Sequence, residues 1–280
     1  MTATLRGLEG KNVLVTGAAK GLGYGIVMDF ADAGCDIAAM DLAGPATGIY
    51  ELASPDLLAE TAATVVEKGR RCIPLQSDIR DESQVQEAVA RALDFFDGRI
   101  DVLVNVAGVA AFDSIVDMRS ETLHAVIDTN IKGTMFMAKY VVPGMIERAS
   151  GNIVNMSSGT TKTGMSNVSH YVPSKWAVNG LTVCWANELA EYGINVNAVA
   201  PAAIKPSGGH GSGMVTGFSK ALDMSADEAF EVISAANNLP GKKWRTEVSD
   251  VSDAVLFLAS DNASQITGHI LYVDGGQSAK

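Results

Sequence analysis

The sequence predicts an α/β protein in which seven short parallel strands form a doubly wound sheet with helices on both faces. Three observations support this prediction. Apolar runs of strand length alternate with amphipathic stretches of helix length along most of the chain, which is the order of repeated strand–helix units. The runs are continuously apolar, as expected for strands that are buried on both faces. A glycine-rich segment joins the first strand-like run to the first helix-like one, where such a unit needs a tight turn.

The expected elements follow one another from end to end. The strands are expected at residues 11–16, 35–40, 72–76, 101–105, 152–156, 195–200 and 270–273. The helices are expected at residues 21–33, 54–68, 81–96, 120–148, 171–191 and 248–259, with the long stretch 120–148 broken into two near Lys132 and Gly133. No repeat and no linker-like change of composition interrupts this order. We therefore expect residues 1–280 to form a single domain.

Two predicted connections are longer than the usual length of about 2–6 residues. The first, residues 42–53, precedes a helix in which Ser54 is expected as the N-cap and Pro55 as the first residue. The second, residues of about 205–247, combines a glycine-rich stretch with a helical stretch near 219–237 and several apolar side chains. We interpret this second connection as a mobile substrate lid with an apolar inner face. The alternative is a surface loop with no role in substrate binding.

Composition excludes several kinds of partner. The 280 residues include 21 Lys and Arg against 32 Asp and Glu, which gives a formal net charge of −11. No run of basic residues is longer than a pair such as Lys242 and Lys243, whereas nucleic acids and anionic membranes require clustered positive charge. No apolar stretch reaches the ~18 residues that span a bilayer. We therefore expect no nucleic-acid partner and no membrane association.

Cysteine and histidine usage indicates the compartment. Cys35, Cys72 and Cys184 are odd in number and far apart, and the four histidines are scattered. This pattern is typical of free thiols in a reducing compartment and predicts no metal site. Because the N-terminus also lacks a signal-peptide pattern, we expect a cytoplasmic location.

The turn after the first strand predicts a nucleotide-binding site. Gly17 permits a tight turn, Gly21 lets backbone N–H groups approach a pyrophosphate, and Gly23 lets the helix pack closely against the strand. The positive end of the following helix would face the phosphates. Three glycines are common in turns and are weak evidence by themselves. The prediction depends on the position of these glycines between an expected strand and an expected helix. The fold expected is therefore of the Rossmann type.

NAD is favoured over NADP as the cofactor. Asp41 ends the second strand, about 20 residues beyond the glycines, where a carboxylate accepts hydrogen bonds from ribose hydroxyls and repels a 2′-phosphate. Lys20 in the glycine loop favours the opposite choice, and we give Asp41 the greater weight. The alternative for Asp41 is an ordinary residue at the start of a turn.

Polar residues also follow the third and fourth strands, at the sheet edge where open α/β sheets bind ligands. Asp78 and Ile79 follow the third strand, and Asn105, Ala107 and Gly108 end or follow the fourth. Taken alone, Asp78 is compatible with a helix cap, and Asn105 is compatible with a side chain that ties neighbouring strands together. Their position at this edge favours contacts with the cofactor.

Tyr171 and Lys175 form the predicted reactive pair. They are four residues apart on an expected helix and therefore lie on one face. A tyrosine with a pKa of about 10 is a poor base, and lowering its pKa to ~7 requires about 4 kcal/mol. A lysine ammonium and a positively charged nicotinamide would supply that field. Ser158 would hydrogen-bond the substrate oxygen, and Asn130 would stand behind the lysine and hold a water. The alternative for the pair is an exposed helical contact of little energetic weight.

Together these motifs resemble the short-chain dehydrogenase/reductase family over nearly the whole chain. The matching segments, in the family's order and spacing, are residues 16–23, Asp41, Asp78, residues 105–108, Asn130 and residues 156–158, 171–175, 195–202 and 272–276. The resemblance implies a catalytic tetrad of Asn130, Ser158, Tyr171 and Lys175, in which Tyr171 is the acid/base and Lys175 also holds the nicotinamide ribose. It also implies a homotetramer with the long helices and the C-terminal strand at its interfaces.

The resemblance also completes the expected cofactor site. It implies that Ile204 lies near the carboxamide of the nicotinamide. The residues expected to contact NAD are Gly17, Lys20, Gly21, Leu22, Gly23, Asp41, Leu42, Asp78, Ile79, Asn105, Ala107, Gly108, Tyr171, Lys175, Pro201 and Ile204.

Several features depart from the family's usual pattern. Val106 replaces an asparagine, Ala202 replaces a glycine, and Pro206 stands where a threonine often touches the cofactor. The insertion at 42–53 is similar to that of carveol dehydrogenase-like members, some of which keep NAD bound through turnover. By its position the insertion would lie near the adenosine ribose. If NAD is not exchanged, an external electron acceptor is required.

We therefore expect an NAD-dependent oxidoreductase that interconverts a secondary alcohol and a ketone. An apolar alicyclic, terpenoid or aromatic substrate is favoured because the expected substrate-contacting residues are mostly apolar or small. These are Phe112, Thr160, Met165, Met214 and Phe218. The alternatives are a catalytically silent NAD-binding scaffold or redox sensor, and a methyltransferase, which would leave Ser158, Tyr171 and Lys175 unexplained.

Overall fold

The computed structural model describes most of the chain. The described residues are 5–44, 49, 52–205, 213–235, 238–239 and 246–279, with side chains omitted at 213, 214 and 221. The insertion at 42–53 and the expected lid at about 205–247 are therefore described only in part. Pro206 lies outside the described residues.

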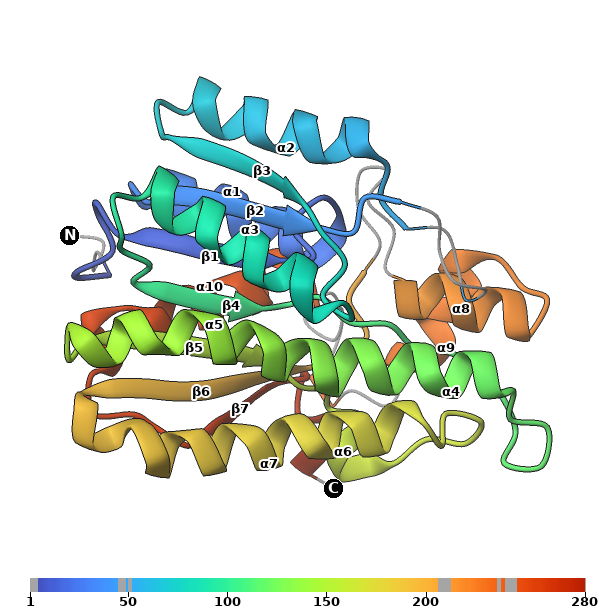
Figure 1. Ribbon diagram of the computed structural model, residues 1–280. Coiled ribbons are helices and arrows are strands. Elements are labelled where there is room, and N and C mark those ends of the chain that lie inside the picture. The colour runs from blue at the N-terminus through green and yellow to red at the C-terminus, as the bar shows by residue number, and fades with distance from the viewer. Residues whose placement is uncertain are drawn as a thin grey trace.

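Seven strands form one parallel sheet, as predicted (Figure 1). They are β1 (Asn12–Thr16), β2 (Asp36–Asp41), β3 (Cys72–Gln76), β4 (Val102–Asn105), β5 (Gly151–Met156), β6 (Ile194–Pro201) and β7 (Ile270–Val273). Their order across the sheet is β3-β2-β1-β4-β5-β6-β7, and all six neighbouring pairs are parallel. The order reverses between β1 and β4, which is where open α/β sheets form a ligand-binding crevice.

Helices cover both faces of this sheet. α1 (Gly21–Asp32), α2 (Pro55–Glu67) and α10 (Val248–Ala259) pack on one face through a buried apolar cluster that includes Val13 and Val15 of β1. α3 (Glu82–Phe95), α5 (Thr134–Glu147) and α7 (Tyr171–Leu189) pack on the other face, against Leu14. Successive β1 side chains therefore point into different cores, which is why its sequence is continuously apolar.

The start of α2 agrees with the sequence. Ser54 accepts a hydrogen bond from the backbone N–H of Leu57, and Pro55 is the first helical residue. α3 begins in the same way, because Asp81 accepts hydrogen bonds from the N–H groups of Ser83 and Gln84.

Residues 120–148 contain two α-helices, as expected, and the second begins directly after Gly133, but no break in the helical path separates them. α4 (Ser120–Ile127) continues through a π-helical segment (Asp128–Gly133) directly into α5. Gly133 is needed for close packing, since a Cβ at this position would lie 2.6 Å from the side chain of Ile79. The glycine is therefore explained by its contact with the loop between β3 and α3.

The remaining helices lie near the carboxyl ends of the strands (Figure 1). The described part of the expected lid contains α8 (Gly213–Ala221) and α9 (Ala226–Ser234) instead of one helical stretch. A short helix, α6 (Thr160–Thr163), follows β5 and was not expected. Single 3-10 turns occupy Ala190–Tyr192, Asp261–Ala263 and Gln277–Ala279.

Within the described ranges, the structure contains no helix that is long and apolar enough to cross a membrane. The same ranges hold no group of three or more His, Cys, Asp or Glu side chains placed to bind a metal ion. All three cysteines are free thiols.

Candidate active site

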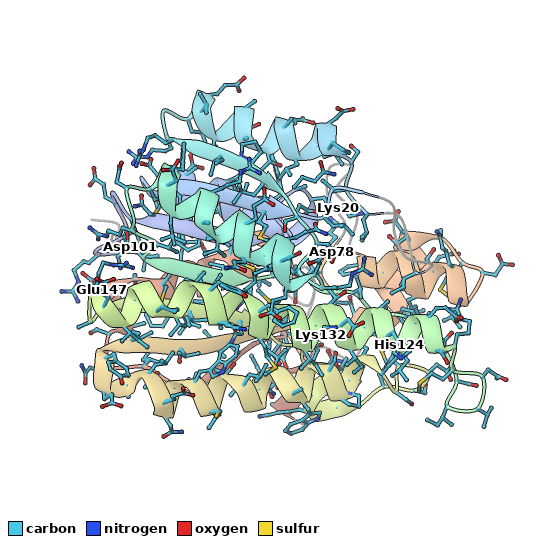
Figure 2. All side chains as sticks on the ribbon, in the orientation of Figure 1. Lys20, Asp78, Asp101, His124, Lys132 and Glu147 are labelled. Carbon is cyan, nitrogen blue, oxygen red and sulfur yellow. The ribbon has the colours of Figure 1, made fainter. Side chains whose placement is uncertain are left out.

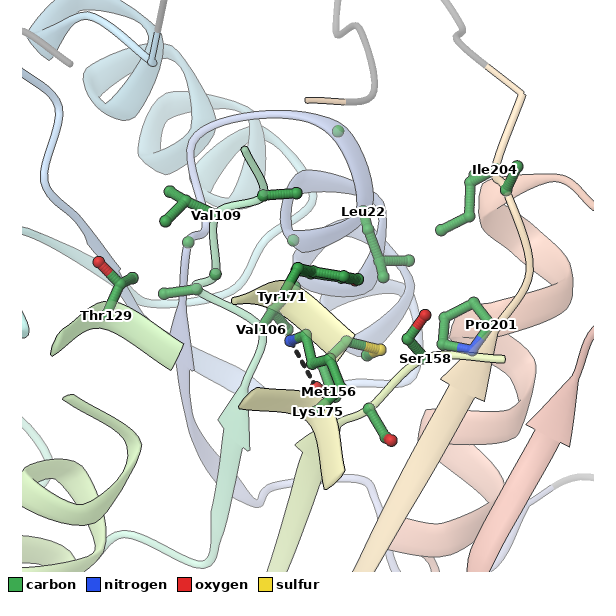
Figure 3. Close-up of a pocket in the computed structure, with 18 of the residues that line it drawn as sticks. Leu22, Val106, Val109, Thr129, Met156, Ser158, Tyr171, Lys175, Pro201 and Ile204 are labelled. Atoms are coloured by element: carbon green, nitrogen blue, oxygen red, sulfur yellow. Dashed lines mark hydrogen bonds between the residues drawn. The ribbon is translucent and has the colours of Figure 1, made fainter. Parts of the chain in front are cut away.

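A cavity of about 490 Å³ opens at the carboxyl end of the sheet (Figure 3). It brings together segments that are far apart in the sequence. The predicted residues that line it are Gly17, Lys20, Gly21, Leu22, Gly23, Asp41, Leu42, Asp78, Ile79, Ala107, Gly108, Ser158, Thr160, Met165, Tyr171, Lys175, Pro201, Ile204 and Phe218. Figure 2 shows Lys20 and Asp78 at this end of the sheet, whereas Asp101 and Glu147 lie at the other end.

The glycine turn after β1 leaves space that side chains would fill. Gly17 and Gly21 have φ angles of +69° and +57°, which glycine adopts without strain. A Cβ at Gly23 would lie 1.9 Å from the carbonyl oxygen of Gly17, and a Cβ at Gly17 would lie 2.9 Å from the Cα of Ala107. At the N-terminus of α1, the cavity is therefore bordered by backbone that carries no side chains at these glycines. This arrangement fits a pyrophosphate.

Asp41 lies at the rim of the cavity in a fixed orientation. Its Oδ2 accepts a hydrogen bond from the N–H of Ala19 at 3.0 Å, and its Oδ1 accepts one from the N–H of Ala43, also at 3.0 Å. A carboxylate has about four acceptor sites, so both oxygens can accept further hydrogen bonds. This geometry fits the hydroxyls of an adenosine ribose.

Asp78 is paired with Arg80, a residue that the sequence analysis missed. Nη2 of Arg80 lies 2.6 Å from Oδ2 of Asp78, and Nε lies 2.9 Å from Oδ1. Burial alone would raise the pKa of Asp78, but the hydrogen bonds and charge of Arg80 outweigh it and hold the pKa below its usual range. Arg80 also lines the cavity, so this end of the site holds a carboxylate and a guanidinium side by side.

The side chain of Asn105 ties strands together, the alternative considered above. Its Nδ2 donates to Oδ1 of Asn155 at 2.9 Å, and Nδ2 of Asn155 donates to Thr182 at 3.0 Å. Asn105 is buried, and the described lining of the cavity does not include it. Any contact of Asn105 with a cofactor would therefore come from its backbone.

Val106 stands where the family usually has an asparagine, and the loop after β4 is fixed here by other hydrogen bonds. Oγ1 of Thr16 accepts hydrogen bonds from the N–H groups of Val106 and Ala107, both at 3.1 Å. Both residues line the cavity. A hydroxyl from β1 thus fixes the backbone of this loop next to the glycine turn.

Tyr171, Lys175 and Ser158 face the same part of the cavity (Figure 3). Nζ of Lys175 donates to the carbonyl oxygen of Met156 at 2.8 Å and lies 5.7 Å from the centre of the Tyr171 ring. A Cβ at Gly108 would approach Lys175 Nζ to 3.2 Å, so glycine at this position makes room for the ammonium group. The predicted reactive residues are therefore brought together by β5 and α7.

Asn130 lies behind this group, and both ends of its side-chain amide are hydrogen-bonded to protein atoms. Its Nδ2 donates to the carbonyl oxygen of Val109 and to Oγ of Ser174, both at 2.9 Å. Its Oδ1 accepts from the N–H of Val109 at 2.8 Å. The described lining of the cavity does not include Asn130. Its expected role in holding a water stays a prediction.

Burial changes the titration of both reactive side chains. It raises the pKa of Tyr171 to about 12, against the opposing effect of a hydrogen bond with Ser158. It lowers the pKa of Lys175 to about 8. At pH 7 the lysine is therefore mostly protonated and the tyrosine keeps its proton.

The expected substrate residues divide into three groups. Thr160, Met165 and Phe218 line the main cavity. Phe112 instead lines a smaller cavity of about 190 Å³ and contacts Phe218 edge-on, with ring centres 5.5 Å apart. The side chain of Met214 lies outside the described residues.

Many lining residues were not expected from the sequence. They are Leu52, Ala53, Ser77, Arg80, Val106, Val109, Thr129, Met156, Ser157, Ala202, Ala203, Val248 and Gln277. The other lining residues lie in segments from which substrate contacts were expected, namely residues 110–112, 160–168 and the lid; they are Ala110, Thr163, Gly164, Lys205, Val232 and Ile233. Ser77, Met156 and Ser157 follow or end strands, so their position at the sheet edge was a usable signal. No sequence pattern distinguishes Val248 or Gln277, which reach the cavity only through tertiary packing.

Comparison with known proteins identifies relatives over the whole length of the chain. A family model described as enoyl-(acyl carrier protein) reductase matches residues 17–278. Oxidoreductase UcpA of Salmonella typhimurium is 35% identical over 272 residues, 97% of this chain and 95% of the relative. (-)-trans-Carveol dehydrogenase of Rhodococcus erythropolis is 34% identical over 276 residues, 98% of this chain and 99% of the relative. The crystal structure of carveol dehydrogenase from Mycobacterium avium in complex with NAD is 33% identical, with a TM-score of 0.88 over 97% of this chain and 99% of that one.

The fold and the cavity define a dinucleotide-dependent oxidoreductase. The chain belongs to the short-chain dehydrogenase/reductase family, and carveol dehydrogenases are among its relatives. The predictions of a Rossmann-type sheet, of this family and of an oxidoreductase are thereby confirmed.

Proposed function

We propose that this enzyme uses NAD to interconvert a secondary alcohol and a ketone, with Tyr171 as the acid/base. The observation that carries this proposal is that one cavity is lined both by the glycine turn with Asp41 and by Ser158, Tyr171 and Lys175. Nucleotide recognition and proton transfer are thus available in the same space. The similar carveol dehydrogenase crystallised with NAD also supports the choice of cofactor.

The residues at the two ends of the cavity have separate tasks in this proposal. The backbone around Gly21 holds the pyrophosphate, Asp41 binds the adenosine ribose, and Lys175 holds the nicotinamide ribose. NAD, when bound, supplies the two-electron acceptor for alcohol oxidation and the donor for ketone reduction. Asp41 disfavours a 2′-phosphate through charge repulsion.

In this proposal Ser158 donates a hydrogen bond to the reacting oxygen, and Tyr171 transfers the proton. Its Oγ accepts hydrogen bonds from Oγ1 of Thr160 at 2.9 Å and from the N–H of Thr160 at 3.2 Å. With its acceptor positions used, the hydroxyl of Ser158 can only donate, either to Tyr171 or to the reacting oxygen. A donor fixed in this way stabilises charge that develops on the substrate oxygen.

Tyr171 removes the hydroxyl proton in alcohol oxidation and returns it in ketone reduction. With a pKa of about 12, the phenol keeps its proton at pH 7, so little phenolate is present to act as the base. The ammonium of Lys175, one helical turn along α7, favours the phenolate and so assists oxidation. Asn130 is hydrogen-bonded to Ser174 and so holds the turn of α7 that lies between Tyr171 and Lys175.

An apolar alicyclic, terpenoid or aromatic alcohol fits the substrate end of the cavity best. Met165, Phe218 and Ile233 present apolar side chains there. Removing such a substrate from water favours its binding by about 25 cal/mol per Å² of apolar surface. The similarity to carveol dehydrogenases supports a terpenoid alcohol.

The organisation of the enzyme is also part of the proposal. Residues 1–280 form a single dinucleotide-binding and catalytic domain, the insertion at 42–53 borders the adenosine ribose, and the segment of about 205–247 is a substrate lid. Leu42 and Ala53, the first and last residues of the insertion, line the cavity. The enzyme is a cytoplasmic homotetramer. If the insertion prevents NAD from exchanging, an external electron acceptor completes the cycle.

The proposal is tested with the Tyr171→Phe variant and a panel of alicyclic, terpenoid and aromatic alcohols. Formation of reduced nicotinamide is followed by absorbance, and NAD binding is measured by calorimetry. We expect turnover by the parent enzyme, and a loss of at least about 100-fold in the variant with NAD affinity retained. Tyr192→Phe is the matched control and should behave like the parent.

Two other outcomes are informative. Full turnover by Tyr171→Phe would overturn the assignment of the acid/base, and NAD binding without turnover of any alcohol would favour a silent scaffold. Reduction of a co-purifying nucleotide in a single turnover, restored by an added electron acceptor, would instead establish a non-exchangeable cofactor.

A further inference from the structure

A buried polar cluster lies next to the cavity and takes no part in the function proposed above. It consists of Asp113, Arg119, Thr122 and His170, and is called the Asp113 cluster here. Oδ1 of Asp113 accepts from Nε of Arg119 at 3.0 Å, and Oδ2 accepts from Oγ1 of Thr122. Nε2 of His170 lies 3.3 Å from the same Oδ2. Asp113 and His170 are 8% and 1% exposed, so this contact is shielded from water.

The direction of the bond between His170 and Asp113 follows from the charge of the carboxyl. Burial alone would raise the pKa of Asp113, but hydrogen bonds from Thr122 and Arg119, the charge of Arg119 and the bond to His170 hold the pKa below its usual range. The carboxylate can only accept hydrogen bonds. Nε2 of His170 is therefore the donor.

Packing alone does not explain a histidine at position 170. Its Nδ1 is buried and has no hydrogen-bond partner among the described residues, and a buried polar atom without a partner costs about 1–3 kcal/mol. An apolar side chain of similar size would avoid this cost. What the imidazole adds is the hydrogen bond to Asp113.

This bond is made at the start of the helix that carries the acid/base. Tyr171 is the first residue of α7, and His170 at the N-cap makes no side-chain capping bond. A helix provides no partners for the N–H groups of its own first residues, and those of Tyr171 and Val172 donate instead to the carbonyl oxygen of Val168 in the segment before α7. Tyr171 therefore occupies a position that the helix alone holds weakly.

Asp113 connects the segment before α7 to the loop after β4 at three points. Its N–H donates to the carbonyl oxygen of Asn167 at 2.9 Å, its backbone pairs with Val168 in an isolated parallel bridge, and its side chain accepts from His170. One turn beyond Tyr171, Ser174 is bonded to Asn130. The first turn of α7 is thus held on both sides of Tyr171.

We propose that Asp113 and His170 are positioning residues, which hold the first turn of α7 so that the Tyr171 phenol stays aligned with Ser158. Arg119 and Thr122 keep the Asp113 carboxylate in place for this task. This inference rests on the proposed function of Tyr171 as the acid/base.

The test uses His170→Ala, His170→Gln and Asp113→Asn in the full-length enzyme. For each variant, kcat and KM for the alcohol are measured with saturating NAD, and the NAD dissociation constant is measured separately. We expect His170→Ala to lower kcat by about 10- to 100-fold, since a small misplacement of a reacting group has effects of this size. NAD affinity should stay within about twofold, because neither positioning residue is among the described residues lining the cavity.

Rescue and a matched control distinguish positioning from a general loss of structure. The glutamine of His170→Gln offers an N–H donor to Asp113, so kcat should recover to within about threefold of the parent. His269→Ala removes an exposed histidine ring and should leave all three constants unchanged. If His170→Ala does not fold, His170→Gln and Asp113→Asn decide the question, with a retained kcat expected for the first and a lowered kcat for the second.

The results that overturn the inference are clear. They are a parental kcat in His170→Ala and Asp113→Asn, or a kcat in His170→Gln as low as in His170→Ala. Tyr171→Phe is assayed in parallel: if it retains turnover, the proposed function fails. If it abolishes turnover while His170→Ala and Asp113→Asn leave kcat unchanged, only the positioning role fails.

Discussion

At the residue scale, the chemistry of the cavity depends on how burial acts on two side chains. Burial raises the pKa of Tyr171 to about 12 and lowers that of Lys175 to about 8, because a low-dielectric environment disfavours the charged form of each. The two changes have different consequences at pH 7. Tyr171 is almost entirely protonated, so little phenolate is present, whereas Lys175 still carries most of its positive charge and favours the phenolate of its neighbour.

Lys175→Met should therefore slow alcohol oxidation and move its pH dependence. Oxidation requires Tyr171 without its proton, so kcat rises with pH, and loss of the ammonium moves that rise to higher pH. We expect kcat at pH 7 to fall by at least about 100-fold, measured over pH 6–11 with saturating NAD. Lys139→Met, which alters an exposed lysine paired with Glu82, is the control. A profile of Lys175→Met that coincides with the parent's would contradict the role of the charge.

At the scale of elements, the strand–turn–helix unit of β1 and α1 is determined by contacts that only glycine permits. Gly17 and Gly23 approach neighbouring backbone so closely that a Cβ would overlap it. The sequence indicated this unit because its three glycines lie close together in the chain. The sequence also indicated that the helix type changes at Gly133, but not that the helical path continues through it. It also gave no sign of the contact of Gly133 with the side chain of Ile79, which comes from the loop between β3 and α3.

Gly23→Ala should damage the nucleotide end of the cavity. The new Cβ would lie 1.9 Å from the carbonyl oxygen of Gly17, so the turn must shift away from its phosphate-binding position. We expect NAD to bind at least about 10-fold more weakly, a loss of roughly 1.4 kcal/mol, in a fluorescence titration with the reduced cofactor. Gly180→Ala, inside α7 with nothing within 4 Å of the new Cβ, should leave NAD affinity unchanged and stabilise the helix by about 0.5–1 kcal/mol. Equal affinities for the parent and Gly23→Ala would contradict this account of the turn.

At the scale of the whole molecule, apolar side chains are exposed on the helices that cover one face of the sheet. Met135 of α5 and Trp176 and Val183 of α7 are 46%, 54% and 44% exposed. Both helices lie in the front layer of Figure 1. Exposed apolar groups of this size favour contact with another protein surface, which agrees with the proposed homotetramer.

Trp176→Glu should weaken that association. A carboxylate buried at a subunit contact without a partner is costly, so we expect a smaller species than the parent in sedimentation velocity at micromolar concentration. Val66→Glu alters a side chain of similar exposure, 57%, on α2 at the opposite face of the sheet, and should not change the size. An unchanged size for Trp176→Glu would place the subunit contact elsewhere.

The sequence by itself determined the strands, the glycine turn and the pairing of Tyr171 with Lys175. Each is encoded within a few consecutive residues, by apolar periodicity or by helical spacing, and needs no knowledge of distant contacts. The positions of Asp41 and Asp78 followed because parallel strands place their carboxyl ends at one edge.

Only the tertiary structure decided which distant residues meet around these elements. It brought Arg80 and Gln277 into the cavity, turned Asn105 toward Asn155, and joined Asp113 to His170. The contacts of Asn105 with Asn155 and of Asp113 with His170 join residues 50 and 57 positions apart. Their formation depends on closing long loops and on the packing of whole elements, which no local pattern records.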